Sequence, residues 1–253
     1  ASRSERASAI APLLRGLAST DKPMVGHFTD APEVLEFMAS TKYKKLAALG
    51  TSCPDHFLRT KVRPLAVDLP GDTDIEKLKA RILQLHQQFR ADYERYYRSF
   101  AKKDSPAMRG ADPAIVLIPG VGMFSFGVNK QTARVAGEFY INAINVMRGA
   151  EAISSYEPIA EAEKFAIEYW LLEEAKLLRM PKPKRLSTRV AFITGSASGI
   201  GKAIAERVVA EGGCVVVADL NFEAAQQVAE NFGRDAALAV SVDVTSEESI
   251  KAA

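Results

Sequence analysis

The chain contains few cysteines, histidines and tryptophans, and it has no long apolar run. Of its 253 residues, two are cysteine (Cys53 and Cys214), three are histidine and one is tryptophan. Two cysteines so far apart in sequence do not indicate a disulfide framework, so we interpret both as reduced thiols of a cytoplasmic protein. No stretch approaches the ~20 consecutive apolar residues of a transmembrane helix, and no charged and apolar leader opens the chain. We therefore expect no membrane partner.

An excess of charge of one sign is also lacking. The 33 lysines and arginines are balanced by 31 acidic residues, which leaves a formal net charge of +2. Binding to nucleic acid requires basic residues clustered on one face, so this balance favours small-molecule partners instead. A hydrophobic content of 47% and a charged content of 25% are typical of globular proteins with a buried core. The length suits two modest domains.

A proline-bearing basic segment predicts the boundary between these domains. Pro181 and Pro183 remove backbone donors and disfavour helix in the residues before them. We interpret residues 181–188 as a solvated linker between a first domain over 1–180 and a second over 189–253. Its three positive side chains, Lys182, Lys184 and Arg185, are assigned no function.

The first domain reads as a mixture of helices and strands. Apolar residues at helical spacing predict helices over 31–40, 74–100, 130–147 and 158–178. A short strand is expected over 45–49, and two strands within 114–127 are expected to turn through residues 119–122.

After the linker the pattern becomes β-α-β-α-β. Strands are predicted over 189–194, 214–219 and 237–244, with helices over 200–211 and 223–231 between them. Helices between apolar strands imply parallel pairing with right-handed crossovers. The fold class is therefore α/β, with the first βαβαβ half of a doubly wound Rossmann sheet in this part of the chain.

A glycine-rich turn between the first of these strands and its helix carries the chemistry. In Thr194-Gly195-Ser196-Ala197-Ser198-Gly199-Ile200-Gly201, Gly195 suits a tight exit from the strand. Gly199 and Gly201 let the main chain approach a pyrophosphate and the sheet, and the phosphates would lie on free N–H groups at the helix start. The alternative is a glycine loop without a ligand.

An acidic residue at the end of the next strand selects the cofactor. Asp219 lies close to the ~20-residue offset expected for a carboxylate that binds ribose hydroxyls. Its charge repels a 2′-phosphate, and neither Leu220 nor Asn221 supplies a compensating cation. NAD is therefore preferred over NADP. The alternative role for Asp219 is that of a turn residue capping the next helix.

The spacing Gly-x-x-x-Gly-x-Gly resembles the short-chain dehydrogenase/reductase family over residues 188–253. The resemblance implies that Asp243, in Val242-Asp243-Val244-Thr245, contacts the adenine amino group. Alternatively, Asp243 helps to start a helix in which Thr245 and Glu248 have capping-box spacing. The expected cofactor contacts are Thr194, Gly195, Ser196, Ser198, Gly199, Ile200, Gly201, Asp219, Leu220, Asp243 and Val244.

No residue of this chain is assigned a catalytic role. The family transfers hydride with a Ser and a Tyr-x-x-x-Lys pair, and no tyrosine follows Tyr169 here. We expect these groups to lie beyond Ala253. We also expect NAD to bind weakly or not at all, since half of the sheet and the nicotinamide side would be missing.

The first domain offers weaker site candidates. His27, His56 and His86 form no close-spaced pair, so no metal ligand is assigned to any of them. The cations Arg59, Lys61 and Arg63 would face one side of an extended segment, where Arg59 and Lys61 could hold a sugar phosphate. A solvated strand edge protected by charge is the alternative interpretation.

Taken together, the run from Gly50 to Lys61, the hairpin ending in Gly122-Met123-Phe124-Ser125-Phe126-Gly127, and the dehydrogenase start resemble a bifunctional family. This is the class II aldolase/short-chain dehydrogenase fusion of the rhamnulose-1-phosphate aldolase and lactaldehyde dehydrogenase type. In that family a hairpin histidine binds zinc, but Val121 stands at the corresponding position here. No zinc ligand is therefore assigned, and the metal would belong to another part of the full-length aldolase.

The resemblance implies a sequence of two reactions. Zinc-dependent retro-aldol cleavage of rhamnulose 1-phosphate would give dihydroxyacetone phosphate and lactaldehyde, which the dehydrogenase would oxidise with NAD. The expected partners are these sugar phosphate and aldehyde substrates, and we expect a homo-oligomer. Two alternatives remain open: a short-chain dehydrogenase for another sugar or polyol, and a first domain that serves only as an assembly lobe.

Overall fold

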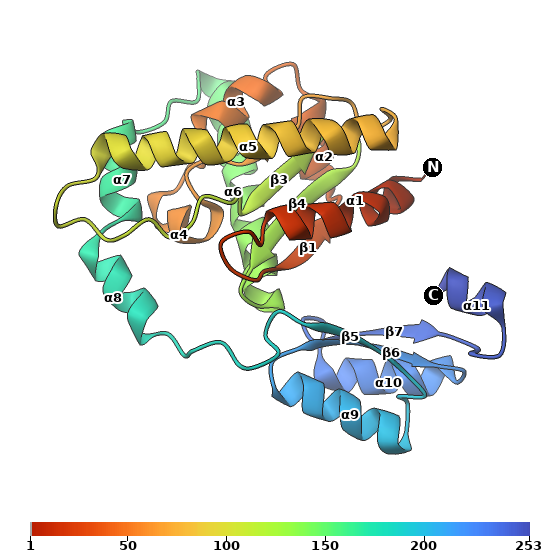
Figure 1. Cartoon of the computed structure of the whole chain (residues 1–253). Coiled ribbons are helices and arrows are strands. Elements are labelled where there is room, and N and C mark those ends of the chain that lie inside the picture. Colours follow the sequence, from red (N-terminus) through yellow and green to blue (C-terminus); the bar gives the residue numbers. More distant parts are fainter. Residues whose placement is uncertain (1) are drawn as a thin grey trace. The chain divides into compact units, whose positions relative to one another are not determined.

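The structure is a computed structural model that describes residues 2–253, and these form two compact units (Figure 1). The first unit takes in the chain through Gly127 together with Thr132–Pro181. The second contains Lys182–Ala253 and the short stretch Val128–Gln131.

The first unit is built on a mixed four-stranded sheet. Its strands are β1 (Val25–Thr29), β2 (Leu65–Ala66), β3 (Ile115–Ile118) and β4 (Gly122–Gly127), in the spatial order β1-β4-β3-β2. β4 runs antiparallel to both β1 and β3, whereas β2 and β3 are parallel. The predicted hairpin within 114–127 is confirmed.

Helices make up most of the rest of the first unit. They are α1 (Arg3–Leu17), α2 (Pro32–Ala39), α3 (Tyr43–Leu49), α4 (Phe57–Thr60), α5 (Ile75–Phe100), α6 (Lys130–Ile153), α7 (Glu161–Glu168) and α8 (Leu171–Arg179), with a 3-10 turn η1 over Pro54–His56. Asp74 caps α5, because its carboxylate accepts hydrogen bonds from the N–H groups of Glu76 and Lys77.

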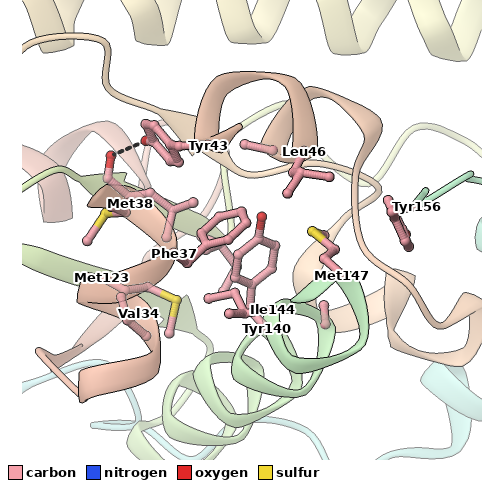
Figure 2. Close-up of a cluster of buried hydrophobic side chains, with 14 of the residues drawn as sticks. Val34, Phe37, Met38, Tyr43, Leu46, Met123, Tyr140, Ile144, Met147 and Tyr156 are labelled. Carbon is pink, nitrogen blue, oxygen red and sulfur yellow. Dashed lines mark hydrogen bonds between the residues drawn. The ribbon is translucent and has the colours of Figure 1, made fainter. Parts of the chain in front are cut away.

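The central hairpin divides the core of the first unit in two. Every residue of β3 and β4 is buried, and alternate side chains point to opposite faces of a strand. Ile115, Leu117 and Met123 join a cluster with α2, α3 and α6 (Figure 2), while Val116, Ile118 and Phe124 pack with α1 and α5. The sheet therefore lies between α5 and α6 in Figure 1.

A third, aromatic cluster joins α4, α7 and the C-terminal half of α5. It contains Phe57, Tyr93, Tyr96, Phe165 and Tyr169. Phe165 and Tyr169 stack with their ring centroids 4.8 Å apart. This cluster holds the segment after α3 against the helical layer.

Two elements of the first unit differ from the sequence predictions. The strand expected over 45–49 is wrong: these residues belong to α3, because Tyr43, Leu46 and Ala47 are buried at helical spacing. The single helix expected over 158–178 is also wrong. It is broken at Tyr169 and Trp170, where the backbone leaves the helical region, so that α7 and α8 are separate helices.

The second unit is a parallel sheet with the order β5-β6-β7. Its elements are β5 (Val190–Thr194), α9 (Gly199–Ala210), β6 (Cys214–Asp219), α10 (Phe222–Phe232), β7 (Ala237–Ser241) and α11 (Glu247–Ala252). Val215 and Val217 of β6 pack with Ala205 of α9 and Ala225 of α10, which places both helices on one face of the sheet (Figure 1). The α/β class and the Rossmann-like βαβαβ order are confirmed.

In the part of the chain that the structure describes, no helix combines the length and the apolar character that crossing a membrane requires.

A buried acid ties together three segments of the first unit. Asp112 accepts hydrogen bonds from the Thr20 N–H at 2.9 Å and the Thr20 hydroxyl at 2.5 Å, and its carboxylate lies 3.1 Å from His86 Nε2. Arg90 of α5 also pairs with it. Burial alone would raise the pKa of Asp112, but the hydrogen bonds from His86, Thr20 and Arg90 outweigh burial and hold this pKa well below its ordinary value.

We predict that Asp112 makes the unfolding free energy fall in acid. Because its folded pKa is lowered, the stabilisation is present above the ordinary Asp pKa of 3.8 and is lost as the pH falls toward the folded value. Asp112→Asn should lower the free energy of unfolding at pH 7 by about 2 kcal/mol. Its urea midpoint should also change less than the wild-type midpoint between neutral and acidic pH. Equal acid sensitivity of the two proteins would contradict this role.

Two buried tyrosines of the cluster in Figure 2 should respond in opposite ways to loss of the hydroxyl. Tyr140 is fully buried and its hydroxyl has no hydrogen-bond partner among the described residues, whereas the Tyr43 hydroxyl donates toward the carbonyls of Val67 at 3.2 Å and Leu117 at 3.3 Å. We predict that Tyr140→Phe raises the free energy of unfolding by about 1 kcal/mol and that Tyr43→Phe lowers it by about as much. Urea unfolding of both variants checks the pair. Destabilisation by Tyr140→Phe would show that its hydroxyl is satisfied.

Candidate cofactor site

The predicted cofactor residues gather at the carboxyl ends of the three parallel strands of the second unit. The glycine turn follows β5, Asp219 ends β6, and Asp243 follows β7. Strand register joins these ends directly, because Thr194 pairs with Ala218 and Asp219 pairs with Ser241. The Val242 N–H also donates to the Asp219 carbonyl at 3.0 Å. Ligands of open α/β sheets bind at this edge.

The glycines of the turn differ in what they contribute. Gly195 and Gly199 have positive φ angles of 64° and 54°, and an added Cβ at either position would meet open space. Gly201 has ordinary backbone angles, but a Cβ there would overlap the carbonyl oxygen of Gly195. The first two glycines therefore allow the chain to turn, and the third allows α9 to approach the end of β5.

The start of α9 has free capacity for an anion. Ser198 is the N-cap residue of α9, but its side chain makes no capping hydrogen bond. The first N–H groups of a helix have no partner within the helix, and they attract negative charge. An uncapped helix start beside two open glycines matches the predicted position of a pyrophosphate.

Ser196 has a structural role that the sequence did not reveal. Its side chain is fully buried, and its hydroxyl donates to the Ile193 carbonyl at 2.6 Å while accepting from the Ala218 N–H at 3.1 Å. Ser196 thus fixes the turn to β6. Its hydroxyl does not face the open edge, so it is a positioning residue rather than a side-chain contact for a cofactor.

Asp219 contacts the glycine turn directly. One carboxylate oxygen accepts a hydrogen bond from the Ala197 N–H at 3.0 Å, and the other accepts from the Asn221 N–H at 3.0 Å. The cap of α10 is Asn221, whose side chain accepts from the Ala224 N–H. The alternative assignment of Asp219 as the helix cap is therefore wrong.

The remaining predicted contacts are exposed side chains around this edge. Ile200 is 81% exposed, Leu220 72% and Val244 59%, and Thr194 and Ser198 are also exposed. Apolar side chains left this open at the carboxyl edge are available to pack against a ring system.

Asp243 is engaged with its own loop. Its carboxylate accepts from the Thr245 N–H at 2.9 Å and hydroxyl at 2.7 Å, and these bonds lower its pKa. The alternative capping box of Thr245 and Glu248 is wrong, because Ser246 caps α11 by accepting from the Ser249 N–H.

The three cations after the Cys53 loop do not share one face of an extended segment, so that prediction is wrong. Arg59 lies in the short helix α4, and Lys61 follows it with a positive φ of 55°. The Lys61 ammonium donates to the Gly110 carbonyl at 2.7 Å and lies 3.6 Å from the centre of the Tyr93 ring. Burial lowers the pKa of Lys61 to about 8. Lys61 is therefore turned inward, away from any phosphate that Arg59 would reach.

The residues of the first unit do not fit a zinc centre. Val121 lies fully buried at the hairpin position where the resembling family has a histidine. Among residues 2–253, no three His, Cys, Asp or Glu side chains lie close enough together to hold a metal ion. His86 pairs with Asp112, and the ring of His56 stacks on Phe139 with the centroids 3.9 Å apart.

We predict that Gly201→Ala strains the turn more than a neutral glycine replacement does. The new methyl group would overlap the Gly195 carbonyl, and such overpacking costs about 1–3 kcal/mol. Amide hydrogen exchange in β5 and β6 should accelerate. The matched control is Gly149→Ala in α6, where nothing lies within 4 Å of the added methyl, and which should leave exchange in those strands unchanged. Equal protection in Gly201→Ala and wild type would contradict the close approach.

Comparison with known proteins identifies both parts of the chain. A family model described as the second domain of class II aldolases matches residues 5–177, and a short chain dehydrogenase model matches residues 189–253. An uncharacterized oxidoreductase of Bacillus subtilis (strain 168), YuxG, is 38% identical over 256 residues, which cover 99% of this chain and 37% of that protein.

Other relatives match the second unit alone. A sorbitol dehydrogenase of Cereibacter sphaeroides is 52% identical over 66 residues, which cover 26% of this chain and 25% of that enzyme. The crystal structure of a hydroxysteroid dehydrogenase from Escherichia coli covers 27% of this chain and 30% of its own, with 40% identity and a TM-score of 0.26. The chain thus spans only about 37% of YuxG. It belongs to the class II aldolase second-domain family, and the same chain continues into a short-chain dehydrogenase region.

Proposed function

We propose that this chain is part of a bifunctional sugar-catabolic enzyme. The aldolase-type region takes part in cleaving rhamnulose 1-phosphate to dihydroxyacetone phosphate and lactaldehyde, and the dehydrogenase region oxidises lactaldehyde with NAD. The observation that carries the proposal is the edge formed by the open glycine turn and the Asp219 carboxylate in a chain that also holds an aldolase-family unit.

The arrangement at this edge supports NAD as the cofactor. The pyrophosphate would lie at the uncapped start of α9, and the adenosine ribose would lie beside Asp219. A bound NAD supplies the hydride acceptor for oxidation of an aldehyde. The role proposed for this stretch of chain is to bind and orient the cofactor. It contains no tyrosine after Tyr169 that would serve as a general acid or base.

The described residues of the aldolase-type unit do not form a recognisable metal site. Membership of the class II aldolase family implies a metal ion in the complete enzyme. Among the described residues, however, Val121 stands at the hairpin position, and no three potential ligands lie close together. In this proposal the unit takes part in the cleavage by binding the substrate and by assembling the enzyme, and the metal-dependent chemistry belongs to another part of the full-length protein. The homologue YuxG supports a covalent link between the two regions, since its match covers both.

A second candidate function is a short-chain dehydrogenase for another sugar or polyol, with the first unit as an assembly lobe. The similarity of the second unit to a sorbitol dehydrogenase favours it. The two candidates differ in aldol cleavage, which only the first requires.

We predict that this chain binds NAD weakly, and that it binds NADP more weakly still. A 2′-phosphate beside the Asp219 carboxylate is repelled, and Leu220 and Asn221 carry no positive charge; the expected preference is about tenfold. Saturation-transfer NMR titrations of the two cofactors measure it. Asp219→Asn should bring the two dissociation constants together. Glu223→Gln, which removes a charge from the first turn of α10, should not. Tighter binding of NADP to the wild-type chain would contradict the assignment.

The complete reaction is tested on the protein expressed at the full length of its gene. Rhamnulose 1-phosphate is supplied with NAD, and dihydroxyacetone phosphate and NADH are measured separately. Our proposal expects both products from this one substrate. NADH formation from a polyol without release of dihydroxyacetone phosphate would instead establish the second candidate.

A further inference from the structure

The segment between α3 and β2 forms a closed loop, which we call the Thr51 loop (residues 50–63). The Thr51 N–H donates to the Val62 carbonyl at 3.0 Å and joins the two ends. Gly50 has a φ of 93°, and a Cβ there would overlap the same carbonyl. The neck is thus too narrow for a side chain at Gly50, and the residues between its ends are held in a compact turn.

This loop concentrates polar groups that the fold leaves unpaired. In the described chain, eight buried side-chain nitrogen or oxygen atoms have no hydrogen-bond partner, and four of them belong to this loop: Thr51 Oγ1, Ser52 Oγ, His56 Nδ1 and Arg63 Nε. Thr51 is only 3% exposed. A buried unpaired polar group costs about 1–3 kcal/mol. Four of them in one loop therefore indicate an occupant that supplies their partners.

The chemistry of these four groups matches an oxyanion. Each can donate a hydrogen bond, and none is a carboxylate. Arg59 adds a positive charge at the exposed side, with its guanidinium carbon 5.6 Å from the centre of the Phe139 ring on which His56 stacks. Stacking on Phe139 fixes the plane of the His56 ring, in which Nδ1 lies.

Glu161 neutralises part of the positive charge around the loop. Arg63 forms an ion pair with Glu161, which also accepts from Lys164 at 2.7 Å. Burial lowers the pKa of His56, although the neighbouring Asp55 opposes this effect. The ring is thus neutral near pH 7 and carries one N–H. Among the described residues Arg59 forms no ion pair, and its exposed guanidinium is therefore available at the rim of the loop.

We infer that the Thr51 loop binds the phosphate group of a phosphate monoester, through Thr51, Ser52, His56 and Arg63, with Arg59 at its rim. A phosphate offers more acceptor oxygens than a carboxylate and satisfies several donors at once. The inference rests on the proposed function, since it assigns this unit the phosphate of the sugar substrate. Arg59 is the one predicted phosphate ligand retained in it.

The test follows the three histidines by NMR in the ¹⁵N-histidine-labelled 253-residue chain. Inorganic phosphate and glycerol 3-phosphate are titrated separately, and His56 is assigned from the signal missing in His56→Gln. Both probes should shift the His56 ring signals and leave those of His86 unchanged. Thr51→Val, which replaces the hydroxyl with a methyl group, should weaken binding about tenfold, as expected for loss of one charge-assisted hydrogen bond.

Matched variants separate a specific site from general charge attraction. Ser52→Ala should weaken binding, whereas Ser99→Ala, which removes a hydroxyl from the exposed end of α5, should not. Arg59→Gln should weaken binding, whereas Arg98→Gln on the same helix as Ser99 should not. Unchanged far-UV circular dichroism and urea midpoints show that each variant is folded. Unmoved His56 signals at tens of millimolar phosphate, or equal losses in variants and controls, would overturn the inference.

The inference and the proposed function fail in different ways. Phosphate binding at His56 in a full-length protein that releases no dihydroxyacetone phosphate would leave the loop site and remove the aldolase assignment. Conversely, cleavage with an unchanged KM in Thr51→Val would leave the function and overturn the phosphate site.

Discussion

The burial of β3 and β4 on both faces is the constraint on which the first unit depends. Alternate residues of this hairpin enter two different cores, so helices must cover both sides of the sheet. α3 belongs to the helical layer on one face of the sheet, and from there the chain must return to β2 at the edge of the sheet. The narrow neck between Gly50 and Val62 makes that return compact, and this is how the fold brings four unpaired polar groups into one loop.

In the second unit, the glycine turn depends on close contact between main-chain segments, while the sheet and its helices pack through side chains. Gly201 approaches Gly195, and the buried Ser196 hydroxyl joins the turn to β6. Asp219 then closes the same turn through the Ala197 N–H. The carboxylate that we propose to bind the ribose is thereby also part of the structure of the glycine turn. A substitution at Asp219 affects both roles. Asparagine removes the charge while it keeps the size of the side chain and one acceptor oxygen, so it separates the effect of charge from the loss of the side chain.

The sequence predicted elements with strong local signals and missed those decided by tertiary packing. The limits of β6 matched because its apolar run ends at Asp219, and the long α5 followed from its apolar stripe. α3 was mistaken for a strand because a five-residue window did not include Tyr43, whose burial establishes the helical period. Likewise, the sequence predicted Lys61 as a surface cation. Its ammonium instead turns inward and donates to the Gly110 carbonyl, a tertiary contact that no local sequence pattern indicates. The unpaired atoms of the Thr51 loop follow from burial, which no spacing of residues reveals.

We propose that the aldolase-type unit binds phosphate in the Thr51 loop and holds no metal centre, while the dehydrogenase region binds NAD at the carboxyl edge of its sheet. The most direct measurement is a crystal structure of the chain obtained with phosphate and zinc present, with anomalous data collected at the zinc edge. Our account predicts phosphate density within hydrogen-bond reach of Thr51 Oγ1, His56 Nδ1 and Arg63 Nε, and no zinc peak beside Val121. A zinc peak at the β3–β4 hairpin, or ordered water alone in the Thr51 loop, would contradict it.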